Sequence, residues 1–209
     1  LAVPLLIKAG DALAAAHEAG VVHRDVKPDN LFLIGEPGEP YDVRLLDFGF
    51  AKLRQATQTQ AGMAIGTAEY MAPEQGLADP VDGRTDVYGL GAVLYRVLTG
   101  ELPFRATDDA ELIAKLALLP PTPPRHWNPA VDARLETIVT SALRKMPENR
   151  YPSMKKMLAD LEIVRARRTV PLFAERAIKE PDIYEPQGPI AKGAMPQLRK
   201  LLDLRAKGT

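Results

Sequence analysis

A short polar run carries the side chains best suited to chemistry. His23-Arg24-Asp25-Val26-Lys27-Pro28-Asp29-Asn30 holds a carboxylate, an ammonium and an amide close together, and Asp47 follows 17 residues after Asn30. A carboxylate can accept a proton, a lysine offsets negative charge, and carboxylate and amide oxygens are ligands that Mg²⁺ prefers. These residue types suit the transfer of an anionic group beside Mg²⁺. Taken alone, Asp25 and Asn30 would equally suit a loop in which they cap a turn.

The elements around this run could bring its members together. Apolar residues at 31–34 and 43–46 flank the turn-forming sequence Gly-Glu-Pro-Gly-Glu-Pro at 35–40, a pattern that predicts a β-hairpin. Such a hairpin would let Asn30 and Asp47 converge on one metal site. Residues 47–84 show no sustained periodicity, and a long irregular stretch inside a compact domain is usually functional or disordered.

Helical spacing accounts for most of the remaining chain. Apolar residues three or four apart predict helices over 4–19, 86–98, 108–119, 132–144 and 153–167. Asp108, Asp132 and Ser153 are the expected N-caps of the last three. The segment 86–98 is apolar nearly all round, so we expect a buried helix that ends at Gly100.

Three motifs occur in a fixed order, and together they carry a resemblance. His-Arg-Asp-x-Lys-Pro-x-Asn at 23–30 precedes Asp47-Phe48-Gly49, and Ala72-Pro73-Glu74 follows. Each motif alone can arise by chance, but the joint match resembles the eukaryotic-type (Hanks-type) protein Ser/Thr kinase family, most of all its bacterial members. The likeness covers about residues 3–166. It implies a mostly helical α+β fold, the kinase C-terminal lobe, in which a helical bundle and a small β-hairpin carry the catalytic and metal loops.

The resemblance implies roles for the reactive side chains. Asp25 would orient a substrate hydroxyl and accept its proton, and Lys27 would reach the γ-phosphate of ATP. Asn30 and Asp47 would hold Mg²⁺. These roles define a catalytic loop at 23–30 and an activation segment at 47–74.

Other matched residues would support the site. His23 and Phe48 match members of the family's stacked apolar spine, and Gly49 would let the backbone turn after Asp47. The resemblance further implies that Asp86 anchors the catalytic loop from a helix N-terminus. It also implies that Arg150 pairs with Glu74. Departures from the pattern are Met146, where an Asp is expected, Arg96, where an acid is common, and a longer loop at 35–40.

Regulation by phosphorylation is a further implication. Lys27 and Thr67 are typical of the Ser/Thr-specific branch, and an Arg beside the catalytic Asp, here Arg24, can pair with a phosphate on the activation segment. Thr57 and Thr59 are candidate acceptors, and Thr67 is a third regulatory candidate. Active protein that carries no phosphate on these residues would exclude the assignment.

The expected function is ATP-dependent phosphoryl transfer to Ser or Thr hydroxyls of protein substrates. The family's Gly-rich phosphate loop and strand lysine, which belong to its N-terminal lobe, have no match in residues 1–209, so we expect this chain alone to bind ATP weakly and to have little kinase activity. The alternative is a non-catalytic kinase-like interaction module. We expect the lobe at 1–168. For 169–209 the sequence leaves two alternatives, a linker, which is favoured, or a short docking helix at 196–206, where the apolar spacing is helical.

Composition restricts the other classes of function. Lys+Arg and Asp+Glu are 27 each, so nucleic acid is not an expected partner. The chain has no cysteine, which excludes thiol chemistry and permits a reducing compartment, and it has no apolar run long enough to span a membrane. We expect a cytoplasmic protein, with any membrane anchor outside this sequence and the oligomeric state left open. His17 and His126 lack ligand-spaced partners, and we interpret both as surface residues.

Overall fold

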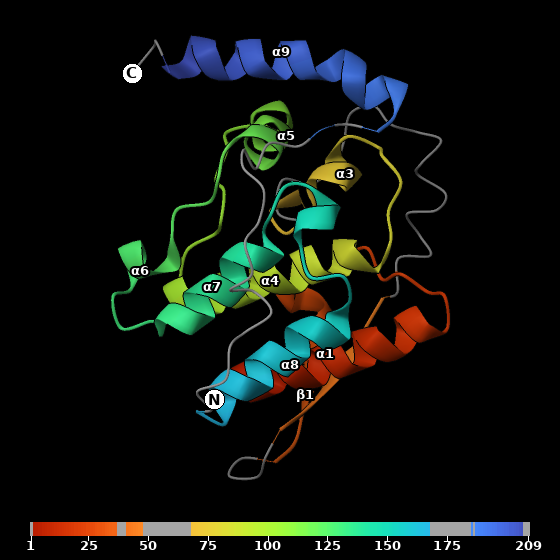
Figure 1. Cartoon of the computed structure of the whole chain (residues 1–209), viewed down its shortest axis with the longest axis vertical. Helices are drawn as coiled ribbons and strands as arrows, with labels where there is room; N and C mark the ends of the chain where they lie inside the picture. Colours follow the sequence, from red (N-terminus) through yellow and green to blue (C-terminus); the bar gives the residue numbers. More distant parts are fainter. Residues whose placement is uncertain (1, 37–40, 48–67, 168–184, 186, 207–209) are drawn as a thin grey trace.

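The computed structural model describes residues 2–36, 41–47, 68–167, 185 and 187–206. These residues are mostly helical and include one small antiparallel sheet, as the sequence predicts (Figure 1). The helical segments of the N-terminal half are α1 (Ala2–Glu18), η1 (Pro28–Asn30), α3 (Pro73–Gly76) and α4 (Gly83–Thr99). Those of the C-terminal half are α5 (Asp109–Leu118), α6 (Pro124–Trp127), α7 (Ala133–Ala142), η3 (Pro147–Asn149), α8 (Met154–Arg165) and α9 (Pro189–Ala206).

The β-hairpin is present where it was expected. Strand β1 (Leu31–Ile34) pairs with β2 (Asp42–Leu45), and Leu31 lies opposite Leu45. The second strand starts and ends one residue earlier than the apolar run suggests, because the register pairs Asp42 with Ile34 and Leu45 with Leu31. The hairpin packs against α1 and continues directly from η1, so its base lies at the catalytic loop.

Helix α4 runs through the centre of the molecule, with α1, α7 and α8 packed around it (Figure 1). Its residues from Thr85 to Tyr95 are all buried, which confirms the prediction from its apolar sequence. Asp82 caps its start by accepting a hydrogen bond from the Arg84 amide (2.8 Å), and Gly100 ends it in the left-handed conformation (φ 75°). The Asp108 and Asp132 caps are also formed, whereas the Ser153 side chain makes no cap hydrogen bond.

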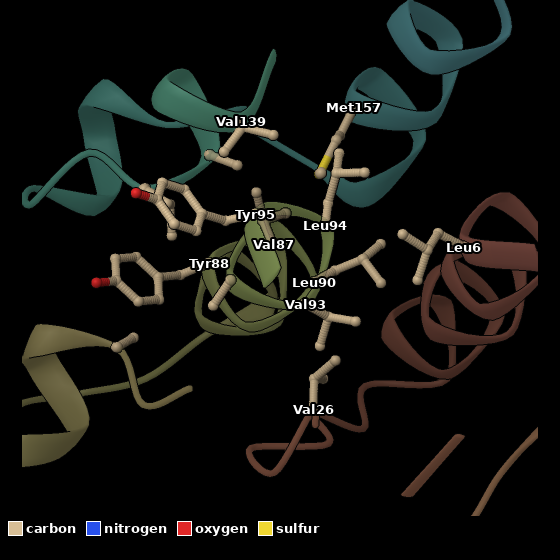
Figure 2. Packing of buried hydrophobic residues seen from close by; sticks show 14 of the residues in the cluster. Leu6, Val26, Val87, Tyr88, Leu90, Val93, Leu94, Tyr95, Val139 and Met157 are labelled. Atoms are coloured by element: carbon tan, nitrogen blue, oxygen red, sulfur yellow. The ribbon is translucent and has the colours of Figure 1, made fainter. Parts of the chain in front are cut away.

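The main hydrophobic core surrounds α4. Figure 2 shows Leu90, Val93 and Leu94 of α4 meeting Leu6 of α1 and Met157 of α8, while Val139 approaches from α7 and Val26 from the catalytic loop. Val26 is 4% exposed, so the loop that carries Asp25 and Lys27 is anchored in the core by the residue between them. Burial of one such side chain contributes about 1.5–3 kcal/mol.

The C-terminal segment differs from the expectation. The predicted short helix at 196–206 is instead α9, which begins at Pro189, includes Pro196, and packs against α5. The helix therefore extends the predicted one toward the N-terminus, and the linker expected before it falls mostly on residues outside the described part of the chain. In the described part of the chain, none of the helices is long and apolar enough to cross a membrane.

Candidate active site

The catalytic loop is attached to the first turn of α4 through one buried carboxylate. Asp86 is 1% exposed; its Oδ2 accepts a hydrogen bond from the His23 amide (2.8 Å) and its Oδ1 accepts one from the Arg24 amide (2.8 Å). Arg24 has φ 68°, a conformation that costs a non-glycine residue free energy and persists where surrounding contacts enforce it. The N-terminal turn of a helix also favours a carboxylate. This geometry is the anchor that the resemblance implied.

His17 is a third partner of the same carboxylate, and the interpretation of it as a surface residue is wrong. Its Nε2 lies 2.6 Å from Asp86 Oδ2, and its side chain is 15% exposed. His17 and Asp86 are 69 residues apart, and His17 has no acidic neighbour at ligand spacing in the sequence, so no local signal could have found the pair. His126 is exposed, as expected.

Asp25, Lys27 and Asn30 form one connected group. Lys27 Nζ lies 3.1 Å from Asp25 Oδ2, and both side chains are less than one fifth exposed. Asn30, which is buried, donates from Nδ2 to the Asp25 carbonyl oxygen (2.7 Å) and to Asp25 Oδ2 (3.2 Å). Since its amide protons face Asp25, the amide presents Oδ1 as an acceptor, the kind of hard oxygen that Mg²⁺ binds.

The end of β2 is bound to this group through His23. The imidazole of His23 is buried; Nδ1 accepts from the Asp25 amide (3.3 Å), so Nε2 is the nitrogen that donates to the Leu46 carbonyl (3.0 Å). The Leu46 amide in turn donates to the Asn30 carbonyl (2.9 Å). Asp47 follows directly, is exposed, and has φ 53°. The backbone beside Asp47 is therefore fixed against Asn30.

Several expected residues lie outside the described part of the chain. They are Phe48, Gly49, Thr57, Thr59 and Thr67. Their roles, and the pairing of Arg24 with a phosphate, stay predictions. Among the described residues, no group of three or more His, Cys, Asp or Glu could hold a metal ion. Mg²⁺ commonly uses one or two carboxylates together with substrate phosphates, a smaller protein ligand set of the kind that Asn30 and Asp47 represent.

A buried ion pair fixes the end of the activation segment. Arg150 donates from Nη1 to Glu74 Oε1 and from Nη2 to Glu74 Oε2, both at 2.7 Å, and both side chains are at most 1% exposed. Thr85 Oγ1 donates to Glu74 Oε1 (2.8 Å), and the guanidinium lies over the Tyr88 ring (4.9 Å). The expected pair is thus present and is attached to the same turn of α4 that carries Asp86.

Gln75 contacts the catalytic loop, and the sequence did not predict this contact. Its Nε2 donates to the Arg24 carbonyl (2.7 Å), and its Oε1 accepts from the Ala72 amide (3.1 Å). One side chain therefore joins the catalytic loop to the start of α3. Its position directly after Ala-Pro-Glu was visible in the sequence, but its partner 51 residues away was not.

A pocket opens between the catalytic loop and residues 70–75. Tyr70 is part of its lining, and burial raises the pKa of the Tyr70 phenol. The full lining is Arg24, Asp25, Val26, Tyr70, Met71, Gln75, Thr85, Asp86 and Gly89. A group that entered this pocket would meet the loop that carries Asp25.

Comparison with known proteins places this geometry in a family. The model of the protein kinase domain matches residues 5–161. The chain is 46% identical over 193 residues to the serine/threonine-protein kinase Pkn1 of Myxococcus xanthus, an alignment that covers 87% of this chain and 28% of that protein. It is 41% identical over 165 residues to the serine/threonine-protein kinase PknB of Mycobacterium tuberculosis, with 77% and 25% covered.

These relatives are much longer than the matched region, since the chain spans 28% of the length of Pkn1 and 25% of that of PknB. The family match nevertheless covers the catalytic loop, both sides of the activation segment, most of α1 and the helices α3 to α7. Protein kinases as a family use ATP and Mg²⁺ and act on protein substrates. The order of the motifs, the anchored catalytic loop and the family match agree, and the chain belongs to the protein kinase family.

Proposed function

We propose that this chain is the catalytic lobe of a protein serine/threonine kinase. The full-length protein would transfer the γ-phosphoryl group of ATP to Ser or Thr hydroxyls of protein substrates. The contact group of Asp25, Lys27 and Asn30, held in place by Asp86, is the observation that carries this proposal. Because ATP is the donor, we place the lobe in the cytoplasm.

In this mechanism Asp25 acts on the acceptor. Its carboxylate would accept a hydrogen bond from the substrate hydroxyl and take the proton as the new O–P bond forms and the bond from the γ-phosphorus to ADP breaks. Lys27 lies beside the same carboxylate, where its ammonium can also offset charge on the transferred group. Positioning of this kind is the main contribution that a protein makes to phosphoryl transfer.

Asn30 and Asp47 are the residues that would hold Mg²⁺, which neutralises phosphate charge when bound. The orientation of the Asn30 amide supports this role, because its protons are directed to Asp25 and its oxygen is the remaining polar atom. The hydrogen bond from the Leu46 amide to the Asn30 carbonyl would keep Asp47 near that oxygen.

The test replaces Asp25 with Asn in the full-length protein. The amide keeps the shape but cannot accept the proton, so we expect kcat to fall by about 10²–10⁴-fold, with ATP affinity changed far less. Asp29→Asn is the matched control, because Asp29 is an exposed acid of the same loop. Both variants are assayed for transfer of labelled phosphate to a Ser/Thr peptide and for ATP binding by calorimetry.

Two outcomes would remove the proposed role. Unchanged turnover in Asp25→Asn would exclude Asp25 from the mechanism. ATP-independent partner binding by a wild-type protein that transfers no phosphate would favour the alternative, a non-catalytic interaction module.

A further inference from the structure

A second hydrophobic cluster lies apart from the core around α4, and α9 forms one side of it. Figure 1 shows α9 lying across α5, at the end of the molecule remote from α1 and α8. The buried members of the cluster come from α9, from α5, from the turn after α3 and from the connection between α7 and α8: Leu77, Ala114, Ala117, Met146, Met195 and Leu198. The family model ends at residue 161, so α9 lies outside the region that it matches.

α9 is amphipathic in a way that fits this position. Met195 and Leu198 are at most 9% exposed and face the cluster, and Leu201 and Leu202 pack against its edge. Basic side chains lie on the solvent side of the helix, among them Lys192, Arg199 and Lys200. The helix therefore presents its apolar side to α5 and its charged side to water.

A buried carboxylate holds the chain where it enters α9. Asp79 is 6% exposed. Its Oδ2 accepts a hydrogen bond from the backbone N–H of Gln187 (2.8 Å), and its Oδ1 accepts one from the backbone N–H of Gly188 (2.6 Å). A Cβ atom on Gly188 would lie 2.7 Å from Asp79 Oδ1, so only glycine fits without a shift. The Asp79 amide donates to the Glu74 carbonyl (2.8 Å), which connects this attachment to the end of the activation segment.

Position 146 of the lobe carries an apolar side chain where the lobe contacts the apolar side of α9. The kinase pattern places an Asp at this position, whereas Met146 is 6% exposed and belongs to the same cluster as Met195 and Leu198. A carboxylate there would lose water without gaining a charged partner on the apolar side of α9, which is costly. Methionine at position 146, in place of the family's Asp, is therefore the kind of residue that the apolar side of α9 requires there.

We propose that residues 187–206 are a docking element bound in cis to the groove formed by α5, Leu77 and Met146. The element is an integral part of the folded lobe, which extends to α9. The occupant of this groove is the chain's own C-terminal segment. Asp79 accepts hydrogen bonds from the backbone of Gln187 and Gly188, and Met146 packs in one cluster with the apolar side chains of α9 that follow. This inference concerns docking and does not depend on phosphoryl transfer.

The absence of cysteine from the chain allows a clean test. Ala117→Cys places a thiol in the groove, where Ala117 is fully buried, and the rate of its reaction with a maleimide under native conditions is measured. Adding Leu198→Asp should release α9 and raise that rate about tenfold or more, since the thiol then reacts from an open groove. Arg199→Asp is the matched control at the next, exposed position, and it should leave the rate within about twofold.

Each outcome decides the proposal. A thiol that reacts equally fast in all three backgrounds would overturn it. Protection that is lost on about a hundredfold dilution would assign the groove to a second copy of the chain and would also overturn docking in cis. Val93→Cys reports on the main core. If Leu198→Asp exposes that thiol as well, the lobe requires α9 for folding, which supports the proposal that α9 is part of it.

Discussion

Replacing Arg150 with Met should destabilise the lobe more than any surface change. The guanidinium donates to both oxygens of Glu74 and also to the carbonyls of Arg144 (2.7 Å), Arg84 (3.1 Å) and Lys145 (2.8 Å). Methionine fills part of the volume but donates no hydrogen bond. Glu74 would then remain as a buried carboxylate with the Thr85 hydroxyl but without its cation.

The expected magnitude follows from this geometry. Removing one partner of a buried ion pair costs about 3–5 kcal/mol, because an uncompensated charge remains in the interior. A domain is typically stable by only about 5–15 kcal/mol, so the loss is a large fraction of the total. For a chain of this length it corresponds to a fall in Tm of about 6–20 °C.

Urea unfolding followed by far-UV circular dichroism measures the free energy of unfolding, and an unchanged m value checks that the comparison is valid. The double variant Glu74→Gln/Arg150→Met is compared with Arg150→Met, because it also removes the unpaired negative charge of Glu74. We expect it to recover about 1–3 kcal/mol relative to Arg150→Met alone. A cost below about 1 kcal/mol for Arg150→Met, or no recovery in the double variant, would refute the reasoning.

Two further predictions concern single hydrogen-bonded side chains. His17→Leu removes a donor to the buried Asp86 carboxylate and should lower the free energy of unfolding by about 1.5–3 kcal/mol. The control His126→Leu, at an exposed position, should change it by less than about 0.5 kcal/mol. Equal effects of the two substitutions in urea titrations would contradict the contact between His17 and Asp86. Glu111 accepts from the Thr107 amide (2.8 Å) and pairs with Lys115 (2.9 Å), and these contacts lower its pKa from 4.5 to about 2. A carboxyl whose pKa is lower in the folded state stabilises the protein above the unfolded pKa, and that contribution is lost as the pH falls from 4.5 to about 2. Glu111→Gln should therefore be less stable than wild type at pH 7, and the difference should shrink across that interval; a difference independent of pH would contradict the assignment.

The first turn of α4 is the common attachment point of the site. Asp86 holds the catalytic loop, Thr85 donates to Glu74, and the Arg84 carbonyl accepts from Arg150. Gln75 adds a direct connection from α3 to the Arg24 carbonyl. A displacement of this turn would therefore alter the catalytic loop and the end of the activation segment together.

Local patterns in the sequence were sufficient for the β-hairpin, for the helices α1, α4, α5, α7 and α8, and for the order of the motifs. The apolar spacing of α4, the Asp108 and Asp132 caps and the turn-rich connection of the β-hairpin depend on residues near one another in the chain, so their signal is present in any short window. The motif residues Asp25, Lys27 and Asn30 lie in one loop for the same reason.

The motifs predicted two distant contacts, Asp86 with the catalytic loop and Arg150 with Glu74, whereas the other long-range contacts were decided by packing. The contact of His17 with Asp86 spans 69 residues, that of Gln75 with Arg24 spans 51, and that of Gly188 with Asp79 spans 109. No periodicity or cap encodes such partners, because each depends on how whole helices pack around α4 and α5. The same holds for α9: its helical spacing is readable in the sequence, whereas its position depends on apolar side chains of α5 and on Met146, which come together only after folding.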